Sequence, residues 1–227
     1  MKTAIPVEEA ARRIPDGASL MIGGFMGVGA PHRLIDALVA HGCRNLTVIG
    51  NDTARPGIGV GKLISSGQVA RVVTSHIGLN PETQKKMLAG EIAVELVPQG
   101  TLAERIRAAG YGLGGVLVKT GIGTLAAEGS QTVVIDGETW LLERPLRADF
   151  ALIHANQADY AGNAAYQLTA TNFNPVMAMA ADLTIAQVQH IRELGELHPH
   201  QIMTPGVYVN RVVQVDRGGD WLTPEAG

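Results

Sequence analysis

The first half of the chain alternates between short apolar runs and stretches of helical periodicity. Apolar runs at residues 19–22 and 46–49 each lead into a glycine-containing loop, as expected for buried strands. Between these runs, apolar residues recur at helical spacing over residues 34–39. Pro31 suits the start of that helix and Gly42 suits its end. This alternation predicts strand–loop–helix units.

Two further units follow the same plan. Strands are expected at residues 69–74 and 92–97, and a helix at residues 82–89. A second helix should open at residues 101–104, where the threonine and glutamate match a capping box. Four such units in succession predict an α/β fold with an open, mostly parallel twisted sheet and helices on both faces.

The second half of the chain does not continue this alternation of strands and helices. Residues 110–129 are rich in glycine and irregular, and residues 133–142 predict a β-hairpin around Asp136-Gly137. Strands are expected again at residues 150–154 and 183–186, with a short helix after Asn174-Pro175. We therefore expect a single domain over residues 1–215 with an inserted hairpin region, followed by a polar tail at residues 216–227.

Composition excludes several classes of protein. With 46% hydrophobic and 17% charged residues, the chain is not disordered as a whole. Its net charge is −3 and it has no cluster of lysine and arginine, which argues against a nucleic-acid partner. The single cysteine, Cys43, excludes an intramolecular disulfide and a cysteine-based zinc site. Without a signal peptide or a run of about 20 apolar residues, a cytoplasmic protein that does not contact membranes is expected.

Three loops are candidates for ligand binding, because open parallel sheets bind ligands beyond the carboxyl ends of their strands. They are residues 23–31, 50–53 and 98–101. Glycines in the first loop allow close approach of the backbone, and a helix after Pro31 would turn unpaired N–H groups toward a phosphate or a developing oxyanion. The alternative is that the first loop is simply a tight strand–helix connection.

Specific nucleotide and metal motifs are absent from the sequence. A dinucleotide fingerprint read from Gly27 would need glycine where His32 stands, so a dehydrogenase is a poor candidate. A phosphate loop at residues 59–63 fails at Pro56 and Leu63. Closely spaced histidines occur only in the polar segment 198–200, so no metal site is expected.

The segment from Asp16 to Pro31 matches the pattern D-G-x-x-apolar₃-G-G-F-x₃-G-x-P at every position. In this the chain resembles the alpha-type chains of family I, 3-oxoacid-type coenzyme A transferases, and within that family the bacterial acetate/acetoacetate type. The similarity extends over nearly the whole chain, to about Val213. Further matching segments are residues 51–53, 75–78, 96–107, 120–124, 142–149 and 171–175.

The resemblance implies a transfer of coenzyme A between two carboxylic acids. A glutamate carboxylate attacks the acyl-CoA thioester to give an anhydride, and the CoA thiolate then forms a glutamyl-CoA thioester. In the family this glutamate lies in a Ser-Glu-Asn-Gly motif of the beta subunit, and this chain has no such motif. The resemblance therefore implies that no catalytic nucleophile lies on this chain and that a beta subunit completes an α₂β₂ heterotetramer.

The resemblance also assigns binding residues. Coenzyme A is a substrate, so neither a cofactor nor a metal is expected. Asn51 and Gln99 carry amides at neighbouring strand ends that suit an acyl oxygen or a carboxylate, although such amides also shape loops. Glu104, Glu128 and Glu143 are expected to be structural or surface carboxylates, and Arg105 and Arg107 to form ion pairs rather than to meet CoA phosphates. The loop residues expected to contact coenzyme A and short-chain acyl substrates are Gly23, Gly24, Phe25, Met26, Gly27, Val28 and Gly29.

Two other classes of function remain open at this point. The chain could be a non-catalytic CoA-sensing domain that kept the loop, or a stand-alone thioester hydrolase or sugar-phosphate isomerase of related fold. Turnover by the isolated chain would favour the second class, and failure to associate with a beta-type subunit would favour the first.

Overall fold

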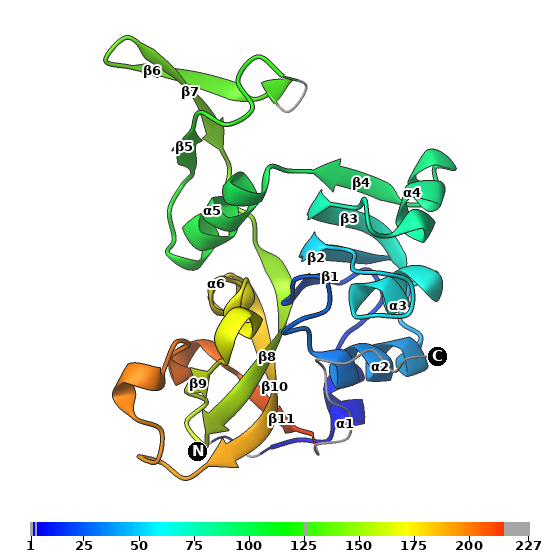
Figure 1. The fold of residues 1–227 in the computed structure, drawn as a ribbon, viewed down its shortest axis with the longest axis vertical. Coiled ribbons are helices and arrows are strands. Elements are labelled where there is room, and N and C mark those ends of the chain that lie inside the picture. Colours follow the sequence, from blue (N-terminus) through cyan, green and yellow to red (C-terminus); the bar gives the residue numbers. More distant parts are fainter. Residues whose placement is uncertain (1, 3, 125–126, 216–227) are drawn as a thin grey trace.

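The computed structural model describes residues 2, 4–124 and 127–215, and its core is a sheet of eight strands (Figure 1). The strand order is β11-β10-β8-β1-β2-β3-β4, and these neighbours all pair in parallel. Only β9 is antiparallel, where it pairs with β8. The strands are β1 (Ser19–Ile22), β2 (Leu46–Asp52), β3 (Val69–His76), β4 (Ala93–Leu96), β8 (Ala148–Asp159), β9 (Ala164–Ala165), β10 (Ala181–Arg192) and β11 (Arg211–Gln214).

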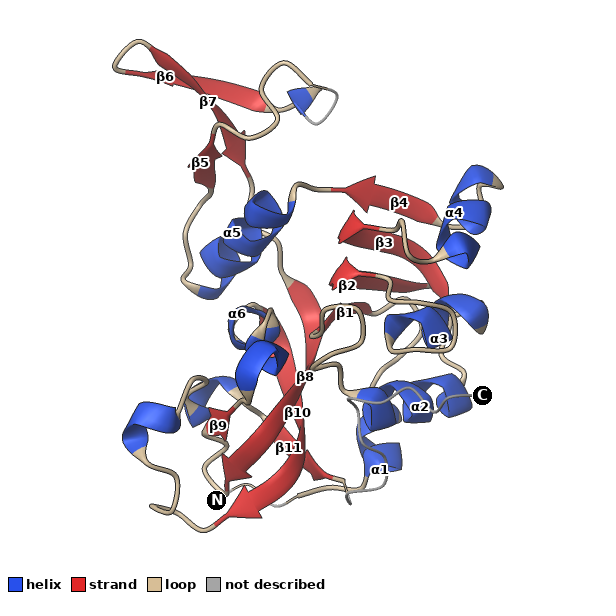
Figure 2. Cartoon of the chain, viewed as in Figure 1, coloured by secondary structure: helices blue, strands red, loops and turns tan. Residues whose placement is uncertain are grey.

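Helices cover both faces of this sheet (Figure 2). Alternate residues of the central strand β1 enter separate cores. Leu20 and Ile22 pack on the side of α1, α2 and α3, whereas Met21 packs on the side of α5 and α6. The predicted α/β fold is therefore confirmed. The helices are α1 (Val7–Ala11), α2 (His32–His41), α3 (Val60–Ser65), α4 (Pro81–Leu88), α5 (Gln99–Gly110) and α6 (Asn174–Ala178), with 3-10 turns η2 (Leu168–Thr171), η3 (Pro199–Gln201) and η4 (Gly206–Tyr208).

A second, three-stranded antiparallel sheet extends away from the main body beyond α5 (Figure 1). It comprises β5 (Val116–Val118), β6 (Gln131–Ile135) and β7 (Glu138–Glu143) in the order β5-β7-β6. β6 and β7 are joined by Asp136 and Gly137, both at positive φ, as a two-residue hairpin turn requires. The inserted hairpin is confirmed, and β5 forms inside the segment for which no regular structure was predicted.

Several local predictions need correction. Helix α5 begins at Gln99, directly after Pro98, and no side chain caps it. Thr101 therefore lies inside the first turn, where its buried hydroxyl has no hydrogen-bond partner among the described residues, so the capping-box prediction is wrong. β2 continues to Asp52, which places Asn51 in a strand and not in a loop. The short helices α1 and α3 were not predicted, and the predicted tail lies outside the described residues.

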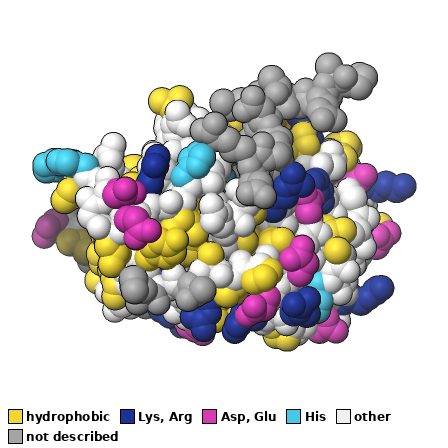
Figure 3. Space-filling model, turned by 90° about the horizontal axis from the view of Figure 1, so that it is seen from below, with side chains coloured by type: hydrophobic (Ala, Val, Ile, Leu, Met, Phe, Trp, Pro, Cys, Tyr) yellow, Lys and Arg dark blue, Asp and Glu magenta, His cyan; other side chains and the backbone are white. Residues whose placement is uncertain are grey.

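The surface shows charges of both signs. On the face drawn in Figure 3, acidic and basic side chains are interspersed among apolar ones. Within the described part of the chain, no helix combines the length and the apolar character that a membrane crossing requires.

Candidate functional site

The loop after β1 folds into a tight turn of its own. Phe25 and Val28 exchange two backbone hydrogen bonds of 2.9 Å, and the residues between them, Met26 and Gly27, have φ of 52° and 90°. Positive φ at both central positions defines a type I′ turn. The side chains of Phe25 and Met26 remain 44% and 40% exposed. The turn thus presents two apolar side chains to whatever binds beyond the sheet.

Close packing requires glycine on either side of this turn. A Cβ atom at Gly23 would lie 1.9 Å from Asn174 Oδ1, and one at Gly29 would lie 2.5 Å from the carbonyl oxygen of Ala170. Real Cβ atoms do not come this near to other atoms, so any larger residue would displace residues 170–174, which include the start of α6. The predicted glycine-rich loop is therefore packed directly against the chain near residues 170–174.

Two asparagines from that segment hold the loop by its backbone. Asn172 accepts a hydrogen bond from the Gly24 N–H and donates one to the carbonyl of Val28, both at 3.0 Å. Asn174 donates to the carbonyl of Gly29 at 3.0 Å. Both residues lie in a segment that resembles the family, yet the sequence assigned them no role. Asparagine is common in turns for local reasons, so its presence at these positions does not predict hydrogen bonds to a distant loop.

A buried histidine holds the tip of the turn. His32 Nε2 lies 2.8 Å from the carbonyl oxygen of Gly27. Because a carbonyl oxygen only accepts, Nε2 must carry the proton. Burial lowers the pKa of His32, which favours the neutral ring. His32 is thus a neutral donor to the loop, and it stands where a dinucleotide motif would have had glycine.

The start of α2 does not supply anion-binding donors, so that prediction is wrong. The N–H groups of Arg33 and Leu34 donate to Gln187 Oε1 at 2.9 Å and 3.0 Å, and the His32 N–H donates to the carbonyl of Ala30. Gln187 reaches the helix from β10 and is fully buried. It satisfies the donors that Pro31 leaves without a side-chain cap.

Backbone donors without a partner in the described part of the chain remain instead in the turn and directly after it. Within residues 23–30 the N–H groups of Gly27 and Gly29 have no acceptor among the described residues, whereas the others are bonded. Both glycines are buried. Buried backbone N–H groups are nearly always paired in native proteins, so unpaired ones at a sheet's carboxyl edge suit a bound oxygen atom.

The two predicted amides join the loop through a third residue. Gln99 Nε2 donates to Asn51 Oδ1, and Asn51 Nδ2 donates to Asp52 Oδ2 at 2.7 Å. Asp52 Oδ2 also accepts the Met26 N–H at 2.9 Å. Asn51 is only 2% exposed, whereas Gln99 faces solvent. Asn51 and Gln99 are therefore linked to the glycine turn, and the link runs through Asp52, which the sequence did not single out.

The glutamates and arginines near this edge are largely paired. Arg105 lies 3.0 Å from Glu95 and 3.8 Å from Glu143, and Arg107 lies 3.2 Å from Glu104. These pairs agree with the structural roles predicted for those side chains. Among the described residues no group of histidine, cysteine and acidic side chains has the arrangement of a metal site.

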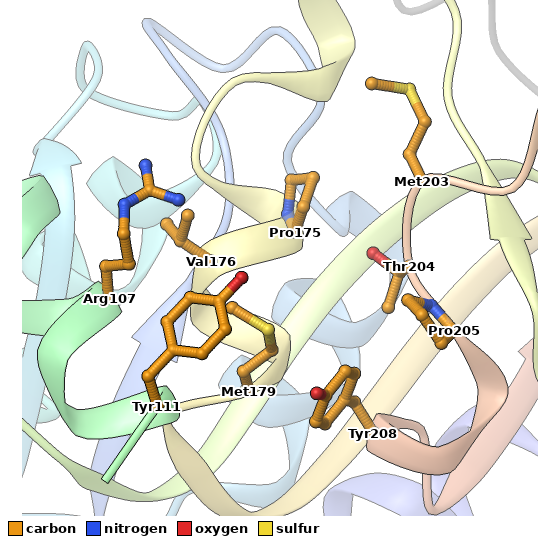
Figure 4. A pocket seen from close by; sticks show the side chains of 9 residues that line it. All are labelled: Arg107, Tyr111, Pro175, Val176, Met179, Met203, Thr204, Pro205 and Tyr208. Carbon is orange, nitrogen blue, oxygen red and sulfur yellow. The ribbon is translucent and has the colours of Figure 1, made fainter. Parts of the chain in front are cut away.

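A separate hollow of about 260 Å³ lies on the α6 side of the sheet (Figure 4). Arg107 and Tyr111 reach it from α5 and its end, and Val176 and Met179 from α6 and its end, opposite Tyr208 (Figure 4). None of the predicted binding residues lines it. The glycine turn, with its free donors and converging amides, is therefore the better candidate site.

Comparison with known proteins identifies the family. The family described as coenzyme A transferase matches residues 4–215. The alpha subunit of acetate CoA-transferase from Escherichia coli (strain K12) is 52% identical over 214 residues, which cover 94% of this chain and 97% of the relative. The alpha subunit of acetoacetyl-CoA:acetate/butyrate CoA transferase from Clostridium acetobutylicum is 51% identical over 199 residues, covering 88% of this chain and 91% of the relative.

Solved structures agree with the sequence relatives. An acyl-CoA transferase from Escherichia coli O157:H7, solved as a thioester complex with CoA, superposes with a TM-score of 0.87 at 25% identity. The match covers all of this chain and 49% of that one, so this chain spans about half the length of that enzyme. Glutaconate CoA-transferase from Acidaminococcus fermentans shares the fold, with a TM-score of 0.82 and 21% identity over 94% of this chain and 75% of that one.

These findings confirm the resemblance read from residues 16–31. They also confirm the prediction of a transferase that works as one part of a multi-chain enzyme, since both relatives are named as alpha subunits. The chain belongs to the coenzyme A transferase family.

Proposed function

We propose that this chain is the alpha subunit of a short-chain acyl-CoA:carboxylate CoA-transferase of the acetyl-CoA/acetoacetate type. One observation carries the proposal: in the signature loop the N–H groups of Gly27 and Gly29 have no acceptor among the described residues, while the sequence lacks the Ser-Glu-Asn-Gly nucleophile motif. This chain thus supplies N–H donors for an acyl oxygen, and the attacking carboxylate must come from a partner chain.

The turn suits the chemistry that the family performs. Attack of a glutamate carboxylate on a thioester creates a tetrahedral oxyanion, which positioned N–H donors stabilise strongly in a site that excludes water. In the proposed mechanism Gly27 and Gly29 offer those donors to the oxygen of the acyl group. Phe25 and Met26 offer exposed apolar surface to the aliphatic part of coenzyme A. In the same proposal the amide of Gln99, which is exposed at the start of α5, contacts the carboxylate substrate.

The partner is proposed to be a beta subunit, in an α₂β₂ heterotetramer. The names of the relatives and the double length of the solved acyl-CoA transferase support this division between two chains. Acetate and acetoacetate are proposed as substrates from the similarity to the Escherichia coli and Clostridium acetobutylicum relatives. In this scheme coenzyme A enters as a substrate, no resident cofactor takes part, and the enzyme is cytoplasmic.

The other classes of function have weaker support. The relatives quoted above are named as parts of transferases, not as hydrolases, isomerases or sensors. A stand-alone thioester hydrolase would also need a reactive carboxylate at the turn, whereas Glu104 and Glu143 pair with Arg107 and Arg105, and both oxygens of Asp52 accept hydrogen bonds.

Reconstitution tests the division of labour. The chain is purified alone and together with a partner that carries Ser-Glu-Asn-Gly, and exchange of coenzyme A between acetyl-CoA and acetoacetate is measured. We expect exchange from the pair and none above background from the single chain. Exchange or thioester hydrolysis by the single chain at a rate near that of the pair would contradict the proposal.

A further inference from the structure

Asp52 is the last residue of β2, and its carboxylate is bonded both to the glycine turn and to the amide of Asn51. Its Oδ2 accepts the N–H of Met26 at 2.9 Å and the Nδ2 of Asn51 at 2.7 Å. Its Oδ1 accepts the N–H of Ala54 at 2.7 Å. The residue is only 8% exposed. Both carboxylate oxygens are therefore committed as acceptors to named donors.

The bond to Met26 acts on a strained position. Met26 has φ of 52°, in the left-handed region that costs a residue with a Cβ about 1–2 kcal/mol. The two bonds between Phe25 and Val28 close the turn but do not attach it to the sheet. The Asp52 bond attaches the tip of the turn to the end of β2. A charge-assisted bond of this kind is stronger than one between neutral groups.

The orientation of the free donors depends on this attachment. The Gly27 N–H follows the Met26 N–H by one peptide unit, so a rotation of the turn about its base would move both together. On the far side of the network, Gln99 donates to Asn51 Oδ1 and Ser75 Oγ lies 3.2 Å from the same oxygen. These bonds hold the Asn51 amide so that Nδ2 faces Asp52.

We propose that Asp52 is a positioning residue, whose carboxylate fixes the Phe25–Val28 turn so that the Gly27 N–H faces the acyl oxygen of the bound thioester. The inference rests on the function proposed above. It adds a residue that sets the geometry of the site without contacting either substrate.

Asp52→Asn tests this with almost no change in volume. An amide can accept at only one of its two ends, so the variant must leave either the Met26 N–H or the Ala54 N–H facing an NH₂ group. We expect the assembled enzyme to lose about 10- to 100-fold in kcat with a smaller change in KM for acetyl-CoA, as for a donor misplaced in the transition state.

Asp149→Asn is the matched control. Asp149 also accepts a backbone N–H with its carboxylate, that of Ser19 at 2.8 Å, but at the opposite end of β1. We expect this variant to keep kcat within about twofold, since it alters no contact of the turn. An equal loss of kcat in both variants would mean that Asp52 acts only through general stability, and would overturn the inference.

Amide hydrogen exchange gives a readout that does not depend on turnover. In the variant Asp52→Asn, the Met26 amide should exchange about tenfold faster than in the wild type, because its charged acceptor is replaced by an NH₂ group or by a weaker, neutral amide oxygen. If the variant does not fold, Gln99→Met, at an exposed position, should raise the same exchange rate by about two- to fivefold by releasing the Asn51 amide. Unchanged Met26 exchange in the folded variants would overturn the inference. Inactivity of the wild-type pair would instead refute the proposed function.

Discussion

Two turns in this protein have the same local geometry and opposite surroundings. Met26-Gly27 and Asp136-Gly137 each have positive φ at both central residues, 52° and 90° in the first and 53° and 79° in the second. The hairpin turn is held by its own two strands, β6 and β7. The loop turn is held by Asp52, Asn172 and His32, which lie on other elements.

This contrast explains why only the Asp136-Gly137 turn was predicted from the sequence. Asp-Gly is a strong local signal for a type I′ hairpin, because aspartate tolerates the left-handed region and glycine prefers it. For methionine that region costs about 1–2 kcal/mol, so the Met26-Gly27 conformation depends on tertiary contacts. Strain that persists through outside support is typical of functional sites.

The largest expected difference between the two turns comes from Gly27→Ala and Gly137→Ala. Both variants place a Cβ at positive φ, which costs about 1 kcal/mol. At Gly27 the new Cβ would also lie 2.6 Å from Ile58 Cγ2, whereas at Gly137 it would meet nothing within 4 Å. We expect Gly27→Ala to lose at least about 100-fold in exchange activity and roughly 1–3 kcal/mol more stability than Gly137→Ala.

Activity assays and urea unfolding of both variants measure this difference. Equal effects of the two substitutions would show that the surroundings of the loop turn do not matter. Loss of assembly in Gly27→Ala would show that the loop is mainly structural.

Acid should destabilise the buried contact between β8 and β10 that supports the start of α2, next to the loop turn. Burial, and then the nearby His32, lower the pKa of His154 from 6.5 to about 4. Gln187 has its Oε1 committed to α2, so its Nε2 faces His154 Nδ1 at 3.4 Å and requires an unprotonated nitrogen there. The unfolded chain therefore binds more protons between pH 6.5 and 4. Stability is fully present above pH 6.5 and falls by up to roughly 3 kcal/mol as the pH drops toward 4.

Urea unfolding at a series of pH values measures the slope. His154→Gln should flatten the part of the curve between pH 6.5 and 4, even if its stability at neutral pH is lower. His200, which is exposed, provides the control, and His200→Gln should leave the slope unchanged. A wild-type slope retained in His154→Gln would assign the acid sensitivity to other groups.

The smallest expected effect comes from asparagine at the first central position of each turn. Asparagine adopts positive φ more readily than methionine, so Met26→Asn should stabilise the chain by about 0.5–1 kcal/mol. It should also raise KM for acetyl-CoA by about two- to fivefold, since an exposed apolar side chain is removed from the proposed binding wall.

Asp136→Asn is the counterpart in the hairpin. Asparagine suits a type I′ turn as well as aspartate does, so the change in stability should stay within about 0.5 kcal/mol. Thermal unfolding and initial-rate kinetics check both variants. Destabilisation by Met26→Asn would mean that the methionine side chain packs favourably enough to outweigh the strain.

Much of the architecture was predictable from local patterns. The apolar run of β1, the helical spacing after Pro31 and the glycine that ends α2 are all signals within a few residues, and the structure contains both elements. The capping-box prediction at Thr101 failed because the helix begins two residues earlier, at Gln99, directly after Pro98. The candidate loop was found for a different reason, namely a sixteen-residue match to a family pattern at residues 16–31.

The supports of that loop were not predictable. Gln187 occupies the α2 donors from 153 and 154 residues away, and Asn172 bonds Gly24 across 148 residues. No periodicity or spacing reports such partners, because they meet only when β8, β10 and the segment before α6 pack beside β1. The sheet and the hairpin could be read from the chain because strand and turn preferences act between neighbouring residues, and the family could be read from the pattern at residues 16–31. Which N–H groups find an acceptor among the described residues depends on the fold, because their partners come from distant segments that meet only by packing.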